Sequence, residues 1–181
     1  MKTIYLIRHC KASGQEPQAP LTEEGIKQAE ELASFFHDKK IDYIVSSPYD
    51  RAVMTVHKLA GKLNVTIHTD ERLRERVLTS EIIHNWMDKL AESFEDPDMK
   101  LVGGESAREA MARGITLIEE IIMRPEKNIA VITHGNLMAL ILAYYTNEPG
   151  YEVWRRLTNP DVYAFAVENS AENIMVKRIW K

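Results

Sequence analysis

The chain has 181 residues, of which 45% are hydrophobic and 28% are charged, a composition typical of one globular domain with a buried core. Its formal net charge of −4 argues against a nucleic-acid-binding protein, which usually carries a basic surplus or stripe. Cys10 is the single cysteine, and the chain shows neither a signal peptide nor a run of the ~20 apolar residues that span a bilayer. We therefore expect a cytoplasmic protein without a nucleic-acid or membrane partner, and the sequence leaves its oligomeric state open.

The first predicted element is a strand over residues 3–7, an apolar run that stops abruptly at Arg8 and His9. In an open parallel α/β sheet, ligands bind at the carboxyl ends of the strands. An imidazole in such a position is exposed enough to react, and a guanidinium beside it can bind an anion through paired hydrogen bonds. Thr22, followed by two acids, then predicts a helix that ends near residue 38.

A second strand is predicted over residues 41–45, and it also ends in polar residues. Ser47 as the N-cap and Pro48 at the first helical position predict that a helix begins there. Arg51 is then in the first turn of this helix, just beyond the end of a strand. Because a cation is unfavourable at a helix N-terminus, this position favours a functional role for Arg51.

A third short strand, over residues 65–68, leads into a dense run of charged residues over 70–76. The spacing of apolar residues predicts a helix over 80–94. Proline and glycine predict a loop over 95–104. A capping box that starts at Ser106 then opens another helix with a clear apolar stripe.

Residues 128–133 are the best candidate for a central strand, because the run is apolar or β-branched after its first residue and carries no charge. The run ends at His134, so a second histidine repeats the placement of His9. A helix that is apolar nearly all round follows, and then a polar segment over residues 150–158 that is compatible with a helix.

Two terminal strands, over residues 162–167 and 174–179, are predicted to pair in antiparallel fashion through a turn over 169–173. Earlier in the chain, strands alternate with helices, which is typical of a parallel sheet. The whole pattern predicts a three-layer α/β sandwich, with a mostly parallel central sheet and an antiparallel edge. We find no repeat and no interdomain linker, and we expect residues 1–181 to form a single domain.

Four polar elements follow predicted strands and should meet at one edge of the sheet: Arg8-His9, Arg51, Arg74-Glu75 and His134. Two guanidiniums and two imidazoles around one point are suited to a tetrahedral anion such as a phosphoryl group. No single one of these elements is specific, but their convergence predicts an anion site with a reactive histidine.

These elements, in this order, resemble the motifs of the histidine phosphatase superfamily, also called phosphoglycerate mutase-like. The matching motifs are Arg8-His9-Cys10, Ser46-Ser47-Pro48-Tyr49-Asp50-Arg51, Leu73-Arg74-Glu75 and Thr133-His134-Gly135. Two further segments also fit the family pattern, Leu21-Thr22-x-x-Gly25-x-x-Gln28-Ala29 and Gly104-Glu105-Ser106. The resemblance implies a phosphoglycerate mutase-like fold and a small cap-like insertion around residues 76–104.

The resemblance also implies a role for each site residue. By analogy His9 is the nucleophile, Arg8, Arg51 and His134 surround the transferring phosphoryl group, and Glu75 gives a proton to the leaving oxygen. The substrate-binding residues implied by the match are Gln15, Gly135 and Asn136. The two arginines and His134 can balance the charge on the phosphoryl oxygens without a metal or a cofactor, so we expect neither.

Several features leave alternatives open. Cys10 stands where the family has glycine, and Lys11 stands where Glu or Gln is common. A side chain at position 10 is able to narrow the pocket or strain the turn, and Lys11 either adds a phosphate contact or points to solvent. The acids that compete with Glu75 are Asp70, Glu71 and Glu81.

Two other chemistries are less well supported by the residues. A cysteine phosphatase with the pattern Cys-x5-Arg would need arginine at position 16, where Glu16 stands. A metal site built from His9, Cys10 and His134 would lack the short spacing typical of metal ligands.

We therefore expect a metal-independent phosphatase that hydrolyses a small phosphorylated substrate, a phosphomonoester, through a phosphohistidine on His9. The short interval between Glu75 and Gly104 leaves room only for a small cap, and an open pocket favours hydrolysis over a reaction that must exclude water. The alternatives are a phosphoglycerate mutase-type phosphomutase on the same residues and a non-catalytic phospholigand-binding protein. The sequence does not identify the substrate.

Overall fold

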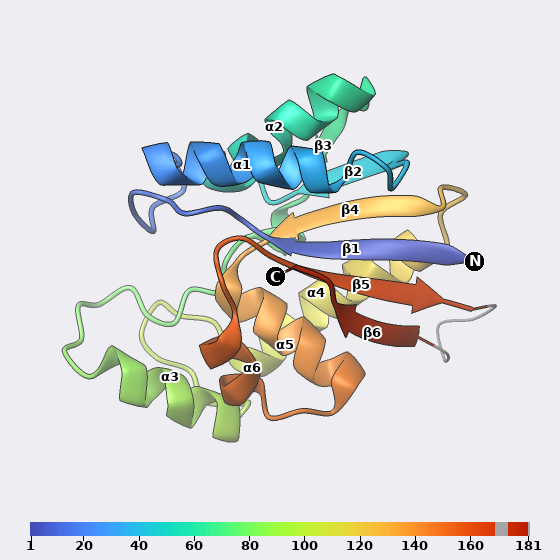
Figure 1. Cartoon of the computed structure of the whole chain (residues 1–181). Coiled ribbons are helices and arrows are strands. Elements are labelled where there is room, and N and C mark those ends of the chain that lie inside the picture. Colours follow the sequence, from blue (N-terminus) through green and yellow to red (C-terminus); the bar gives the residue numbers. More distant parts are fainter. Residues whose placement is uncertain (169–173, 181) are drawn as a thin grey trace.

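The structure of the chain is a computed structural model that describes residues 1–168 and 174–180. Its six strands are β1 (Lys2–Arg8), β2 (Tyr43–Ser46), β3 (Ile67–Thr69), β4 (Asn128–Thr133), β5 (Asp161–Val167) and β6 (Ile174–Arg178). They form one sheet in the order β3-β2-β4-β1-β5-β6 (Figure 1). The first four in this order are parallel, and β5 is antiparallel to both β1 and β6. This confirms the predicted sheet, and the turn predicted over residues 169–173 lies outside the described residues.

Helices cover both faces of the sheet and complete three layers (Figure 1). One face carries α1 (Glu23–Phe35) and α2 (Asp50–Leu63), and the other carries α4 (Ala107–Ile122) and α5 (Gly135–Thr146). Two shorter helices, α3 (Trp86–Glu95) and α6 (Gly150–Arg156), pack against each other beyond α5. A 3-10 turn, η1 (Glu71–Leu73), follows β3. The predicted three-layer α/β sandwich is thus confirmed.

Successive side chains of the central strands enter two different cores. In β1, Ile4 and Leu6 belong to the core under α4 and α5, whereas Tyr5 and Ile7 belong to the core under α1 and α2. The side chains of β4 alternate in the same way. Because both faces of these strands are covered, apolar residues are needed at nearly every position, and this is the pattern that predicted them.

Helix α5 is apolar on nearly all its faces because it packs against β1, α4 and α6 at once. Its 12 residues are fewer than the ~20 that a membrane-spanning helix requires. Within residues 1–168 and 174–180, no helix combines the length and the apolar character needed to cross a membrane.

Two of the three predicted helix N-caps are confirmed. The Thr22 hydroxyl accepts from the backbone N–H of Gly25, and Ser106 forms a complete capping box with Glu109. Ser47, however, is not the N-cap of α2: the helix begins at Asp50, with Tyr49 as its N-cap residue. The Ser47 hydroxyl instead faces the ring of a histidine from another strand, as described below.

The helix predicted over residues 80–94 begins later, at Trp86. Residues before it are held in irregular backbone because they bond to the loop after α3: the N–H of Ser80 donates to Val102 O at 2.9 Å, and that of Glu105 donates to Val77 O at 2.8 Å. The expected apolar face is also only partly buried, since Leu90 is buried but Trp86 and Met87 are exposed. The polar segment over residues 150–158 contains α6.

Candidate active site

The ends of β1 and β4 bring two histidines together. The strands are parallel neighbours in which Arg8 pairs with Thr133, so His9 and His134 follow at equivalent positions. Their ring centroids lie 5.0 Å apart. Arg51, from the first turn of α2, is nearly fully buried and places its Nε 3.3 Å from His9 Nε2. The predicted convergence of these side chains is present in the fold.

His9 is held in one tautomer. Its Nδ1 lies 2.6 Å from the backbone oxygen of Cys10, which can only accept, so Nδ1 carries the proton and Nε2 keeps its electron pair, which accepts from Arg51 Nε. The Asn159 side chain donates to the backbone oxygen of His9 at 2.8 Å and fixes the turn from the other side. Burial, together with the charges of Arg51 and Arg8, lowers the pKa of His9 to about 3. The imidazole is therefore neutral at physiological pH.

His134 is the N-cap residue of α5 and is completely buried. Its Nε2 lies 2.7 Å from the hydroxyl of Ser47. Its Nδ1 has no hydrogen-bond partner among the described residues. Burial is the main cause that holds the pKa of His134 well below its usual range. A buried nitrogen without a partner indicates a position that a ligand would complete.

The two arginines reach the site in different ways. Arg51 donates through Nη1 to the backbone oxygen of Glu16 at 2.8 Å, so the loop before α1 helps to orient it. Arg8 lies at the end of β1, and its Nε is buried without a partner among the described residues. A Cβ at Gly135 would come within 2.9 Å of Arg8 Nη2, so a glycine is needed where α5 begins beside this guanidinium.

Glu75 lies at the N-terminus of α5, although it is more than sixty residues away in the chain. Its Oε2 accepts from the N–H of Asn136 at 3.0 Å, and its Oε1 accepts from Leu137 at 3.0 Å and Arg76 at 2.8 Å. Three N–H donors occupy three of about four lone-pair positions of a carboxylate, so one position stays open for a proton. The positive end of the α5 dipole also favours a carboxylate here.

A cavity of about 350 Å³ lies beside Arg8 and Glu75, and His9, Arg51 and His134 are not among the residues that line it. The polar residues that line it include Arg8, Gln15, Glu75 and Asn136. The side-chain oxygen of Asn136 is buried without a partner among the described residues, as are Arg8 Nε and His134 Nδ1. Unsatisfied polar atoms are uncommon in native proteins, so their grouping here marks a site for a polar ligand. The guanidinium of Arg8, which lines the cavity, favours an anion.

The remaining candidates do not reach this site. Cys10 packs with Leu21 and Ala29 in a small apolar cluster, and burial raises the pKa of its thiol to about 12. The φ angle of Cys10 is not positive, so its side chain does not strain the turn. Cys10 is also not among the residues that line the cavity. Lys11 forms an ion pair with exposed Glu24 instead of facing the site.

Among the acids that competed with Glu75, none lines the cavity. Asp70 accepts from Arg72 and forms an ion pair with it at 2.8 Å. Glu71 and Glu81 are both exposed. The geometry therefore favours Glu75 as the carboxyl group next to the arginines.

Arg8 is also tied to the antiparallel edge of the sheet. Its Nη1 donates to Leu157 O at 3.2 Å and to Thr158 O at 3.4 Å. The N–H of Thr158 donates to the carboxylate of Asp161, which is fully buried and forms an ion pair with Arg178 of β6 at 2.8 Å. A chain of contacts thus joins the last strand to the site.

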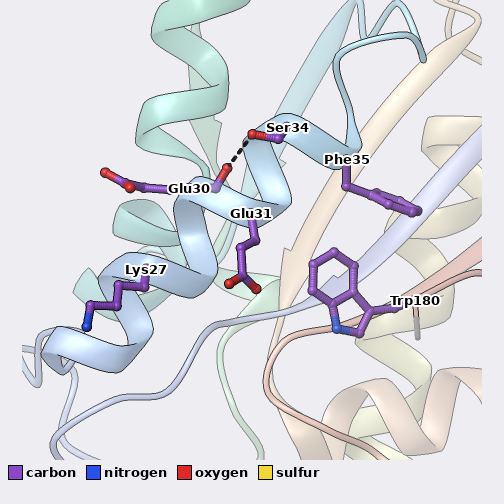
Figure 2. A pocket seen from close by; sticks show the side chains of 6 residues that line it. All are labelled: Lys27, Glu30, Glu31, Ser34, Phe35 and Trp180. Carbon is purple, nitrogen blue, oxygen red and sulfur yellow. Dashed lines mark hydrogen bonds between the residues drawn. The ribbon is translucent and has the colours of Figure 1, made fainter.

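A larger hollow, of about 730 Å³, lies elsewhere, between α1 and the C-terminal Trp180 (Figure 2). It is lined by Lys27, Glu30, Glu31 and Ser34 of α1 together with the edge-to-face pair of Phe35 and Trp180. None of the histidines or arginines of the candidate site faces it, and its charges are mainly acidic. Size alone therefore does not identify the functional site of this protein.

Sequence reasoning missed two residues that position the histidines. Ser47, which contacts His134, was interpreted as a helix cap, because a serine before proline is common at helix starts. Asn159, which holds the backbone of His9, follows a polar segment and carries no local signal of its own. Both act across long chain separations, which a linear pattern does not reveal.

The buried neutral histidines predict an acid-sensitive stability. In the unfolded chain a histidine has a pKa of about 6.5, whereas folded His9 has a pKa of about 3 and that of His134 is also far below normal. Below pH 6.5 the unfolded state therefore binds more protons than the folded state, and the free energy of unfolding decreases as the pH is lowered. The slope is up to about 1.4 kcal/mol per pH unit for each histidine.

Urea unfolding between pH 7 and pH 5 measures this effect. The His9→Asn variant should lose stability less steeply than the wild type over this range, whereas the exposed control His57→Asn should match the wild type. Parallel curves for all three proteins would show that His9 is not buried in its neutral form.

The fold and the site together define a class of protein: an α/β sandwich with two histidines, two arginines and a carboxyl group gathered at one edge of the sheet. The model of the histidine phosphatase superfamily (branch 1) matches residues 4–177. The chain belongs to this superfamily. The resemblance noted in the sequence is thereby confirmed.

Two relatives match over most of their length. A protein of Hydrogenobacter thermophilus named "Putative phosphoserine phosphatase 2" is 28% identical over 171 residues, covering 85% of this chain and 83% of that protein. A protein of Proteus mirabilis named "Probable phosphoglycerate mutase GpmB" is 26% identical over 189 residues, covering 94% of this chain and 87% of that protein. The relatives thus include both reaction types that the sequence left open.

Solved structures share the fold. The phosphoserine phosphatase of Entamoeba histolytica, in complex with 3-phosphoglyceric acid, has a TM-score of 0.81 at 21% identity and covers 100% of this chain and 98% of its own. A mycobacterial glucosyl-3-phosphoglycerate phosphatase has a TM-score of 0.79 at 24% identity, covering 99% of this chain and 97% of its own. These likenesses confirm the phosphoglycerate mutase-like architecture.

Proposed function

We propose that this protein is a metal-independent phosphatase that hydrolyses a phosphomonoester through a phosphohistidine on His9. The observation that carries the proposal is the state of this imidazole: Nδ1 donates to a carbonyl, so Nε2 is unprotonated and its electron pair accepts from Arg51 Nε, beside which a phosphoryl group would bind. Membership of the histidine phosphatase superfamily supports the same reaction class. The residues of the site suffice for the chemistry without a metal or a cofactor.

In the first step, the Nε2 electron pair of His9 forms a bond to phosphorus, and the bond from phosphorus to the leaving oxygen breaks. Arg8 and Arg51 balance the charge on the phosphoryl oxygens, and the neutral ring of His134 donates a hydrogen bond to one of them from Nδ1. Glu75, in its protonated form, gives a proton to the leaving oxygen, so the alcohol departs neutral. Gln15 and Asn136, which line the cavity, bind the substrate.

In the second step, water attacks the phosphohistidine. The nitrogen–phosphorus bond breaks, its electron pair returns to His9, and Glu75 takes the proton of the attacking water. The products are inorganic phosphate and the alcohol. The neutral state of His9 in the free protein allows the cycle to restart without a deprotonation step.

We also propose that residues 1–181 form one domain, in which residues 76–104 act as a small cap over the cavity. Four residues of this segment support this role because they line the cavity: Arg76, Leu78, Trp86 and Leu90. A cytoplasmic location is part of the same proposal, since a chain with one buried cysteine suits a reducing compartment.

The phosphomutase remains a second candidate because several matched relatives are named "Probable phosphoglycerate mutase GpmB". A mutase must retain its phosphoenzyme until the intermediate has turned around, whereas a phosphatase admits water. Hydrolysis is favoured here because the candidate cap contains a single short helix, α3, and leaves a cavity beside Glu75.

Rapid mixing with a radiolabelled phosphomonoester, followed by an alkaline quench, tests both reactions. We expect label on the peptide that contains His9, and release of inorganic phosphate faster than any isomerisation of 3-phosphoglycerate to 2-phosphoglycerate. Isomerisation faster than hydrolysis would identify a mutase. Phosphate binding without label or turnover would identify a non-catalytic binding protein.

A further inference from the structure

One wall of the cavity next to Glu75 is aromatic. Trp86, the first residue of α3, and Trp154 of α6 both line it, at the side that also holds Leu78 and Leu90. The polar residues Arg8 and Asn136 line the same cavity. The cavity thus combines an anion-binding end with an apolar end that two packed helices supply (Figure 1).

Contacts between aromatic side chains hold this wall together. The rings of Trp86 and Trp154 meet edge to face, with centroids 6.2 Å apart, and Tyr151 stacks on Trp154 at 5.8 Å. Phe94 in turn packs against Tyr151 at 6.2 Å. Because this stack supports Trp154, its side chain loses little conformational entropy when the ring of a substrate packs on it.

Arg76 is the charged residue at this side of the cavity, and two of its three guanidinium nitrogens are already paired. Arg76 donates through Nε to Glu105 O and through Nη1 to the Ser93 hydroxyl, both at 3.0 Å. The residue is 4% exposed, and its Nη2 is buried without a hydrogen-bond partner among the described residues, so one donor is left at this side. The other lining residues of this side, Leu78, Trp86, Leu90 and Trp154, offer no charge to a polar substrate group and favour an apolar one.

We propose that the favoured substrates are phosphomonoesters whose alcohol carries a flat aromatic ring, with Trp86 and Trp154 as the residues that determine this specificity. The proposal rests on the phosphatase function proposed above and adds its substrate class. The phosphoryl group occupies the end at Arg8, and the ring packs against the two indoles. A cavity of about 350 Å³ is large enough for such a ring.

The test compares benzyl phosphate with ethyl phosphate, since both leaving alcohols need a proton and differ little in acidity. We expect kcat/KM of the wild type to be higher for benzyl phosphate by about tenfold or more. Trp86→Ala and Trp154→Ala should each remove most of this ratio, and Trp154→Phe should keep part of it. Competitive inhibition by inorganic phosphate reports whether each variant retains a folded anion site.

The control is Met87→Ala, because Met87 is the neighbouring residue of α3, is exposed and does not line the cavity. It should keep the ratio of the wild type. Equal rates for the two esters, or a ratio that survives both tryptophan substitutions in folded variants, would overturn the substrate class while leaving the phosphatase intact. Hydrolysis of neither ester by the wild type would instead overturn the phosphatase function itself.

Discussion

Replacing His9 by asparagine is expected to lower kcat for hydrolysis by at least about 10⁴-fold, because the variant has no nitrogen able to form the phosphoenzyme. Asparagine is close to histidine in size and still accepts a hydrogen bond from Arg51, so the anion site should remain. Steady-state rates with benzyl phosphate measure the loss, and an alkaline quench should detect no label on the protein.

The matched control is His57→Asn, which changes an exposed histidine of the same helix that carries Arg51. It should leave kcat unchanged. Binding of inorganic phosphate, measured by calorimetry, should persist in the His9 variant. A variant that binds phosphate and still hydrolyses the ester at the wild-type rate would show that another residue is the nucleophile.

Replacing Glu75 by glutamine should have an effect that depends on the leaving group. An alkyl alcohol needs a proton as it departs, so we expect kcat for ethyl phosphate to fall by about 10²- to 10⁴-fold. 4-Nitrophenyl phosphate releases a stable phenolate, and its hydrolysis should fall much less. The ratio of the two losses separates proton donation from general damage to the site.

The Glu75 substitution also tests the position of this side chain at the start of α5. A glutamine keeps one oxygen, which can still accept from Leu137 and Arg76, but its NH2 group then faces the N–H of Asn136, so the free energy of unfolding should fall by about 1–3 kcal/mol. Glu71→Gln, at an exposed acid just before it, should change neither the rate nor the stability. Equal losses with both esters would contradict the role of Glu75 as a proton donor.

Most of the fold was predictable because its strands are covered on both faces. A short, nearly uninterrupted apolar run such as residues 128–133 is best accommodated as a buried central strand. Each such strand ends where a polar residue must leave the core. The convergence of His9 and His134 then follows from parallel pairing of β1 with β4, since equivalent positions of parallel strands lie at the same edge.

The segment before α3 was not predictable in the same way. Its helical spacing is real, but the backbone of Ser80 and Val77 bonds to the loop at 102–105, and such long-range bonds override local propensity. The role of Ser47 was missed for a related reason. In the sequence, its hydroxyl suits a helix cap. Only the fold brings His134 within hydrogen-bond distance of this hydroxyl.

The link between Arg8 and the antiparallel edge constrains the far end of the chain. Arg178 of β6 holds Asp161, Asp161 holds Thr158, and Thr158 accepts from Arg8. The guanidinium of Arg8 is thus oriented through β6. A chain cut short before β6 would carry every proposed catalytic side chain and yet have one of its two guanidiniums poorly oriented, so β6 should be needed for full activity.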